Sequence, residues 1–174
     1  MISNLNYFIY ALKTTCPLKI IHNISRGKQM PIRKATAEDE KRVFELLKQF
    51  PPDEVSTINF EAASRAYHQI IQNPKLGTIL VAEEHGEVVG VTTLSYPFAI
   101  RCGGHYSCIE ENIVDERYRG KGVGGKLLMA AIEEATSQGC DEIQVNGPSD
   151  MGFPLYISKG LQDMGKHLKA KLPL

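Results

Sequence analysis

The sequence lacks an excess of either charge, because 20 Lys and Arg residues balance 20 Asp and Glu residues. A balanced charge gives no reason to expect nucleic acid or an anionic membrane surface as a partner. Long apolar runs are missing too, since the stretch at residues 7–12 falls well short of the roughly 20 residues that cross a bilayer. No small-residue cleavage site follows that stretch, which argues against a secretory signal. We therefore expect a cytoplasmic protein with neither a membrane nor a nucleic-acid partner.

Cysteine pairs with metal-ligand spacing are also missing. The four cysteines, Cys16, Cys102, Cys108 and Cys140, form no CxxC motif, and no histidine stands at ligand spacing from them. A zinc site is therefore unsupported, and a disulfide framework is not expected in a chain of this length. We predict free thiols and no bound metal.

Acidic residues are absent from the beginning of the chain, where the first carboxylate is Glu38. Residues 1–29 carry three lysines and one arginine. One interpretation is a transit peptide, which a single arginine supports weakly; the other is that Met30 is the true start. We treat residues 1–29 as an N-terminal extension outside the fold and residues 30–174 as one domain, a size that suits a single core.

From Pro31 onward, the spacing of apolar residues alternates between the periods of strand and helix. Thr36 followed by Asp39 is a hydroxyl cap with an acid three residues on, which predicts a helix start. His85-Gly86 between two β-rich runs predicts a hairpin. Strands are predicted at residues 32–35, 78–82, 88–94, 107–114, 142–145 and 167–172. Helices are predicted after residue 36, from residue 60, after the glycine-rich loop and around residue 156, the third of them carrying Leu127, Leu128, Ala131, Ile132 and Ala135. The order βααβββαβαβ indicates a mixed α/β (α+β) domain with a strand–loop–helix unit at its centre.

A glycine-rich loop joins the predicted strand at 107–114 to the following helix. Backbone N–H groups at a helix start lack internal partners, and the helix dipole favours negative charge there. Glycines leave no side chain in the way of an approaching phosphate, and two lysines add positive charge. These features predict an anion site built from Arg119, Gly120, Lys121, Gly122, Val123, Gly124, Gly125 and Lys126.

Two nucleotide-binding patterns fit this loop but not its context. Gly120, Gly122 and Gly125 match G-x-G-x-x-G, yet a dinucleotide fold needs this motif in an opening βαβ unit, with an acid at the tip of the next strand. The segment from Gly120 to Lys126 also matches G-x-x-x-x-G-K, but Leu127 replaces the hydroxyl residue that would hold magnesium. Both a dinucleotide site and a nucleotide hydrolase are therefore disfavoured.

A third pattern, R-x-x-G-x-G, is present in Arg119-Gly120-Lys121-Gly122-Val123-Gly124. With a strand before it and a helix after it, this loop resembles the acetyl-CoA motif of the GNAT N-acetyltransferase superfamily. The segment Leu155-Tyr156-Ile157-Ser158-Lys159-Gly160-Leu161 is similar to the family's L-Y-x-x-x-G-F segment, and the element order from Ile32 to Leu172 agrees. The resemblance implies a mixed, mostly antiparallel central sheet, splayed between its fourth and fifth strands and flanked by helices. It also implies acetyl-CoA as co-substrate, and the frequent dimerisation of family members makes a homodimer an expectation.

The resemblance further implies acetyl transfer to a primary amine of a small molecule or protein, by direct attack in a ternary complex. In polyamine acetyltransferases, which the stretch resembles, Glu110 aligns with the glutamate that takes the amine proton, and Glu111 with an acid that helps hold the cationic substrate. Ile113 and Val114 map to the strand end whose backbone stabilises the oxyanion and pairs with the pantetheine arm. Tyr156 maps to the acid for the departing thiolate, since a phenol near pKa 10 stays protonated at neutral pH.

Two expectations about geometry accompany this assignment. Successive residues of a regular strand face opposite sides, so only one of the two carboxylates is expected to point at the thioester. Pro154 suits a first helical turn, so a short helix is expected to begin late, just before Tyr156.

A catalytically silent acyl-CoA-binding regulatory domain is the alternative function, because an intact Glu110 and Tyr156 do not by themselves establish turnover. The acidic pair favours a cationic amine. The sequence does not select among a polyamine, an aminoglycoside, an amino acid and a protein lysine.

Overall fold

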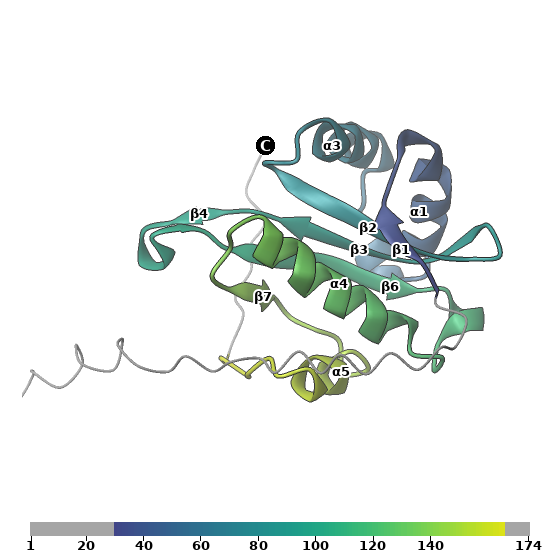
Figure 1. Ribbon diagram of the computed structural model, residues 1–174. Helices are drawn as coiled ribbons and strands as arrows, with labels where there is room; N and C mark the ends of the chain where they lie inside the picture. The colour runs from purple at the N-terminus through teal and green to yellow at the C-terminus, as the bar shows by residue number, and fades with distance from the viewer. Residues whose placement is uncertain (1–29, 166–174) are drawn as a thin grey trace, which may run out of the picture.

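Five strands form one sheet in the order β1-β2-β3-β6-β7 within residues 30–165, which the computed structural model describes (Figure 1). The strands are β1 (Ile32–Lys34), β2 (Gly77–Glu84), β3 (Glu87–Ser95), β6 (Ser107–Val114) and β7 (Ile143–Val145). The helices are α1 (Glu40–Leu47), α2 (Pro52–Val55), α3 (Phe60–Gln72), α4 (Val123–Ser137) and α5 (Phe153–Ser158), with 3-10 turns at Ala37–Asp39, Ile100–Cys102 and Glu116–Tyr118. Helices α1 and α3 cover one face of the sheet and α4 covers the other. The mixed α/β architecture is therefore confirmed.

The sheet is antiparallel from β1 through β6, and only the pair of β6 and β7 is parallel. Strand β7 pairs with β6 only along residues 107–109, whereas β6 continues to Val114. The two strands therefore diverge beyond Ile109. This confirms the predicted splay between the fourth and fifth strands of the sheet, and it leaves a gap along one edge of β6.

A β-bulge interrupts the pairing of β3 with β6. Thr93 pairs with Glu111 and Leu94 pairs with Ile109, so Glu110 is an extra residue on β6. On either side of the bulge the strand alternates regularly. Ile109 packs in the cluster that includes Leu128 of α4, and Ile113 packs in the cluster that includes residues of α1.

Several local predictions are confirmed. The Asp39 carboxylate accepts a hydrogen bond of 2.8 Å from the backbone N–H of Thr36, which caps the first helical turn. His85 and Gly86 have φ of 53° and 81°, as the tight hairpin between β2 and β3 requires. Helix α5 begins at Phe153 with a proline in its first turn, so the late helix start is also confirmed.

Two segments differ from the prediction, and two lie outside the described residues. The chain after Pro51 forms the short helix α2, with a proline in its first turn, which is not among the predicted helices. The loop at residues 97–104 contains a small hairpin that pairs β4 (Phe98–Ala99) with β5 (Gly104–His105). The predicted closing strand at 167–172 and the extension 1–29 fall outside the described range.

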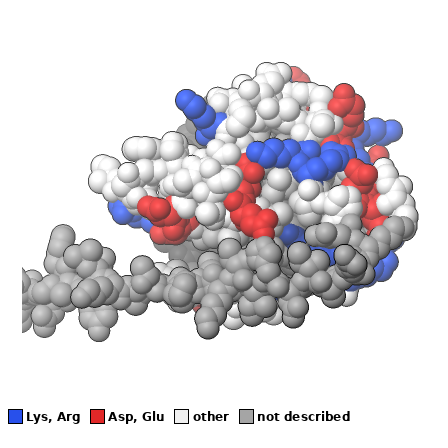
Figure 2. Space-filling view, in the orientation of Figure 1, with Lys and Arg blue, Asp and Glu red and all other residues white. Residues whose placement is uncertain are grey.

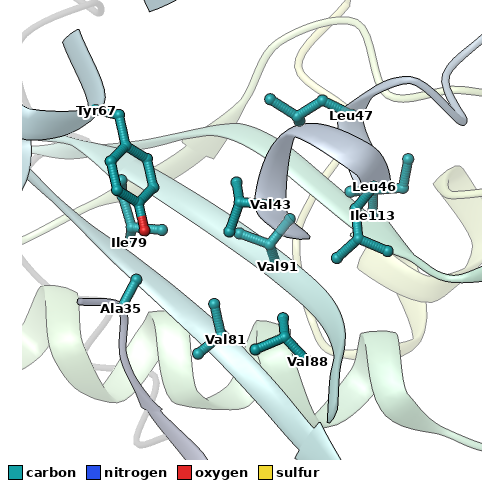
Figure 3. Packing of buried hydrophobic residues seen from close by; sticks show 10 residues of the cluster. All are labelled: Ala35, Val43, Leu46, Leu47, Tyr67, Ile79, Val81, Val88, Val91 and Ile113. Atoms are coloured by element: carbon teal, nitrogen blue, oxygen red, sulfur yellow. The ribbon is translucent and has the colours of Figure 1, made fainter. Parts of the chain in front are cut away.

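Apolar side chains fill both faces of the sheet. The layer under α1 and α3 contains Ala35, Val43, Leu46, Leu47, Tyr67, Ile79, Val81, Val88, Val91 and Ile113 (Figure 3). The layer under α4 and α5 contains Leu80, Leu94, Tyr96, Ile109, Leu128, Ala131 and Tyr156. Gly90 lets α4 pack closely, because a Cβ there would lie 3.0 Å from the Leu127 Cδ1 atom.

The face of the molecule drawn in Figure 2 carries acidic and basic side chains close to one another rather than a patch of a single sign. Among residues 30–165, no helix is both long enough and apolar enough to cross a bilayer.

Candidate active site at the gap between β6 and β7

The start of α4 presents unpaired backbone N–H groups. Gly122 precedes the helix with a left-handed φ of 78° and has no side chain to cap it. The first helical hydrogen bond of α4 runs from the Lys126 N–H to the Gly122 carbonyl at 3.1 Å. No acceptor for the N–H groups of residues 123–125 is found in the part of the chain that the structure describes. These amides, at the positive end of a helix of 15 residues, suit an anion.

The predicted cationic side chains surround this helix start. Arg119, Lys121 and Lys126 are all exposed. The Arg119 Nε group donates to the Val114 carbonyl at 3.1 Å, and the Lys121 ammonium lies 4.6 Å from the centre of the Tyr118 ring. The loop therefore brings together its amides and three positive charges.

The register of β6 determines which backbone groups face the gap. The Asp115 N–H donates to the Val89 carbonyl at 2.9 Å. Hydrogen-bonded and non-hydrogen-bonded pairs alternate along an antiparallel ladder. Ile113 is therefore in the next pair bonded to β3, whereas the peptide groups of Asn112 and Val114 point to the opposite edge, where β7 has diverged. Of the two residues predicted to offer backbone groups here, Val114 faces the gap and Ile113 does not.

The start of α4 adjoins the same gap. A Cβ on Gly124 would lie 3.4 Å from the Leu155 Cδ2 atom and 3.6 Å from the Val114 Cγ2 atom. One residue of α4 thus borders β6 and α5 at once, so the anion site and the gap are continuous.

Tyr156 reaches the gap from α5. Its side chain is 7% exposed, and the Asn112 Nδ2 group donates to its hydroxyl oxygen at 3.3 Å. Burial raises the pKa of the Tyr156 phenol, and the hydrogen bond from Asn112 opposes that rise. The phenol is therefore protonated at neutral pH, as a proton donor must be.

The two neighbouring glutamates lie on one face of the sheet, contrary to the expectation for a regular strand. The Thr93 hydroxyl donates to the Glu111 carboxylate, and the Ser95 hydroxyl donates to the Glu110 carboxylate. Thr93 and Ser95 are two residues apart on β3, so their side chains share a face. The regular alternation assumed for this pair is therefore absent, because the bulge at Glu110 puts both carboxylates on one face.

The shared face changes the acidity of the pair. Burial raises the pKa of Glu111 to about 7, and the nearby charge of Glu110 adds to the rise. Glu110 itself is exposed. A carboxyl group with a pKa near neutrality can exchange a proton at physiological pH.

Asp115 fixes the exit of β6 into the loop. Its side chain is 2% exposed and accepts hydrogen bonds from Arg117 and from Arg42 of α1. Hydrogen bonds from the Arg117 guanidinium hold the pKa of Asp115 well below its usual range. Arg42 also donates to the Val88 carbonyl at 2.9 Å, so α1, β3 and the loop entry meet at one buried carboxylate.

Asn112, Thr93 and Ser95 were not identified from the sequence. Asn112 had a usable signal, since it is an amide between the acidic pair Glu110-Glu111 and the apolar strand end Ile113-Val114. Thr93 and Ser95 had no such signal in the sequence, because threonine and serine are ordinary strand residues. Their hydrogen bonds to the glutamates depend on the bulge.

The remaining histidine and cysteine candidates form no further site. The His105 Nδ1 atom lies 2.9 Å from the Tyr96 carbonyl oxygen, in the loop before β6. Cys102, Cys108 and Cys140 are free thiols. Within residues 30–165, no group of three or more His, Cys, Asp or Glu residues is placed to hold a metal ion.

Sequence relatives of this chain are acetyltransferases. It is 27% identical over 136 residues to an uncharacterized N-acetyltransferase, YhfO, of Bacillus subtilis, which covers 77% of this chain and 91% of that protein. It is 28% identical over 140 residues to the aminoalkylphosphonate N-acetyltransferase of Salmonella typhimurium, covering 78% and 88% respectively.

Solved structures share the fold. The glucosamine-6-phosphate N-acetyltransferase of Arabidopsis thaliana matches with a TM-score of 0.70 and 23% identity, over 84% of this chain and 100% of that one. A predicted acetyltransferase from Clostridium acetobutylicum, solved with acetyl-CoA, matches with a TM-score of 0.69 and 22% identity, over 82% and 96%. The sequence model of the acetyltransferase (GNAT) family matches residues 40–150, which is more than half of the chain. The protein therefore belongs to the GNAT superfamily of N-acetyltransferases.

Proposed function

We propose that the protein transfers the acetyl group of acetyl-CoA to a primary amine of a small molecule or protein, and that the reaction takes place at the gap between β6 and β7. The observation that carries this proposal is the continuity of the free amides of α4 with a gap that holds Tyr156. The free amides of α4, the unpaired backbone edge of β6 and the Tyr156 phenol would then serve as anion site, strand partner for an extended arm and proton donor.

The residues present fit acetyl-CoA, which would supply an acetyl thioester and a thiolate leaving group. The amides of residues 123–125 suit its diphosphate, and Arg119, Lys121 and Lys126 supply opposite charge. The gap-facing peptide groups of Asn112 and Val114 suit the amide groups of a pantetheine arm, as a partner strand would. The backbone N–H of Val114 also suits the developing oxyanion.

The amine would approach from the face of the sheet that carries Glu110 and Glu111. An ammonium group with a pKa of about 10 must lose a proton before its nitrogen can attack. The alignment with polyamine acetyltransferases assigns this proton to Glu110 and the holding of the cation to Glu111. The raised pKa of Glu111 supports the reverse, so we propose Glu111 as the proton acceptor, with the exposed Glu110 attracting the cation.

Tyr156 would protonate the departing thiolate. Its phenol is buried at the gap, where water competes less for its proton, and it is the phenol that aligns with the family's acid. Replacing Tyr156 with Phe should lower kcat about 100-fold, the low end of what a positioned general acid contributes. The Kd for CoA should change little.

The first test is calorimetric titration of the full chain with CoA, and with ADP as a probe of the diphosphate site alone. Thiol release from acetyl-CoA is then measured with a panel of a polyamine, an aminoglycoside, an amino acid and an aminoalkylphosphonate. We expect binding of both ligands and turnover with at least one amine. Absence of any CoA binding would refute the proposal. Binding without turnover on a broad amine panel would favour the alternative, a silent regulatory domain.

Initial rates test the direct attack. In a ternary complex, double-reciprocal plots at several amine concentrations should intersect. Parallel lines would indicate an acyl-enzyme and would contradict this part of the proposal.

We also propose a cytoplasmic location and a homodimer, and no membrane or nucleic-acid partner. Cell fractionation of the tagged full chain would test the location. Light scattering coupled to size-exclusion chromatography would test the dimer, and a monomer at all concentrations would contradict it.

A further inference from the structure

Asn112 is a polar side chain in an apolar position of β6. It lies on the face of the sheet toward α4, where the neighbouring residue on that face, Val114, packs with Val123 and Leu127. Its amide nitrogen donates to the Tyr156 hydroxyl oxygen at 3.3 Å. Its amide oxygen is buried and has no hydrogen-bond partner.

The unpaired oxygen indicates that the amide is not there for stability. A buried acceptor without a partner destabilises a fold, and an apolar side chain of similar volume avoids that loss. A leucine would suit the packing around Val114 at least as well. The presence of an amide at this position must therefore be explained by the hydrogen bond that its nitrogen donates to Tyr156.

We propose that Asn112 is a positioning residue for Tyr156, which donates to the phenol oxygen so that the phenol proton stays available to the leaving thiolate. This inference rests on the proposed role of Tyr156. Within the described residues, the Asn112 nitrogen is the hydrogen-bond partner found for the phenol, and it occupies a lone pair rather than the proton.

In the proposed step, the proton moves from the Tyr156 phenol to the leaving thiolate. The O–H bond of Tyr156 breaks, an S–H bond forms on the thiolate of CoA, and a phenolate remains. The Asn112 N–H group stabilises the phenolate charge, and solvent returns the proton after product leaves. An amide turned by 180° would instead accept the phenol proton and withhold it, so the orientation of Asn112 matters.

The surroundings of Tyr156 offer few competing charges. Burial and the hydrogen bond from Asn112 are the two causes that shift the pKa of Tyr156, and no charged side chain is among them. Glu110 and Glu111 belong to the opposite face of the sheet. A change in the acidity of Tyr156 on altering Asn112 can therefore be attributed to the lost hydrogen bond.

The test compares Asn112→Leu in the wild type and in the Tyr156→Phe background. We expect Asn112→Leu to lower kcat about fivefold to tenfold, the effect of one hydrogen bond to a charged oxygen, with little change in the KM for acetyl-CoA. In the Tyr156→Phe background the same substitution should have no further effect on kcat. An equal loss in both backgrounds would overturn the proposal, because it would show a role independent of the phenol.

A second measurement does not depend on turnover. The Tyr156 phenol is titrated by its phenolate absorbance, with Tyr156→Phe as the blank, and Asn112→Leu should raise its pKa by about one unit. Urea unfolding should show Asn112→Leu at least as stable as the wild type. An unchanged phenol pKa would overturn the proposal.

Thr92→Val is the matched control. Thr92 pairs with Asn112 across β3 and β6, is fully buried, and donates to the Glu111 carbonyl at 3.0 Å. Loss of the Thr92 hydroxyl should lower the free energy of unfolding and leave the pKa of Tyr156 unchanged. If Tyr156→Phe itself retains full activity, the proposed function of Tyr156 fails, and the phenol titration still decides whether Asn112 governs its acidity.

Discussion

Glu111 is a carboxyl group whose surroundings oppose its charge. The side chain is half-buried, and a second glutamate lies beside it on the same face of the sheet. Its pKa of about 7 lies above the ordinary value of 4.5, so the folded protein binds this proton more tightly than the unfolded chain does. The fold is therefore favoured by protonated Glu111 and loses that contribution as the pH rises toward 7.

Glu111→Gln should consequently stabilise the protein at pH 8 and not at pH 5. The gain at pH 8 has an upper bound of about 3 kcal/mol, because each pKa unit corresponds to about 1.4 kcal/mol. Urea unfolding of the two proteins at both pH values measures it. Glu133→Gln, which changes an exposed acid on α4, is the control and should show no such difference between the two pH values. Equal stability of wild type and Glu111→Gln at pH 8 would contradict the raised pKa.

The pH dependence of activity should also reflect the ionisation of Glu111. If Glu111 takes the amine proton, kcat/KM should rise with pH through about 7 and then level off until other groups titrate. Glu111→Gln should abolish that rise and reduce the rate by at least tenfold, whereas Glu110→Gln should mainly raise the KM of a cationic amine. A loss of kcat confined to Glu110→Gln would restore the assignment made from the sequence.

At the scale of elements, the start and the end of α4 use glycine for different reasons. Gly124 lies in the first turn, next to the gap, and a methyl group on it would make only ordinary contacts with Val114 and Leu155. Gly139 follows the last turn with a left-handed φ of 75° and nothing within 4 Å of an added Cβ. The first glycine lies where we propose that the diphosphate binds, and the second permits a left-handed backbone conformation.

Gly124→Ala and Gly139→Ala should therefore separate binding from stability. Gly124→Ala should leave the free energy of unfolding unchanged or slightly higher, since alanine favours helix, and should weaken CoA binding at least tenfold. Gly139→Ala should lose about 1 kcal/mol of stability, because alanine is strained at that φ, and keep its affinity. Calorimetry and urea unfolding on both variants check this. Unchanged CoA affinity in Gly124→Ala would contradict the placement of the diphosphate.

The elements also show what the sequence can and cannot predict. The cap at Thr36, the hairpin at His85-Gly86 and the strand before the glycine loop rest on local chemistry, and all were predicted. The bulge at Glu110 was not, because it depends on how many residues β6 has opposite β3. The orientation of Ile113 away from the gap and the contact of Asn112 with Tyr156 depend on the same long-range register, which no local pattern contains.

At the scale of the whole molecule, Asp115 links parts that are distant in the sequence. Its carboxylate pairs with the guanidinium groups of Arg42 from α1 and Arg117 from the turn after β6, and it is almost fully buried. Removing one partner of such a group leaves charge without compensation, which is more damaging than the loss of a surface ion pair.

Asp115→Asn should lower the free energy of unfolding at pH 7 by about 3 kcal/mol. The pKa of Asp115 is depressed in the fold, so its contribution is present above the ordinary value of 3.8 and is lost as the pH falls below that. The difference between wild type and variant should therefore shrink in strong acid. Asp141→Asn, at an exposed acid before β7, should be close to neutral. A comparable loss in both variants would contradict a special role for Asp115.

The bulge adds one acidic residue to β6 without changing the direction in which the other side chains of the strand point. The pairs on either side of it, Thr93 with Glu111 and Leu94 with Ile109, are already neighbours in a regular ladder. Glu110 is thus a supernumerary residue, and excising it would leave every other position of β6 on the side it now occupies. A homologue or engineered chain one residue shorter here would keep Asn112 opposite Tyr156 while presenting one acid to its amine where this chain presents two.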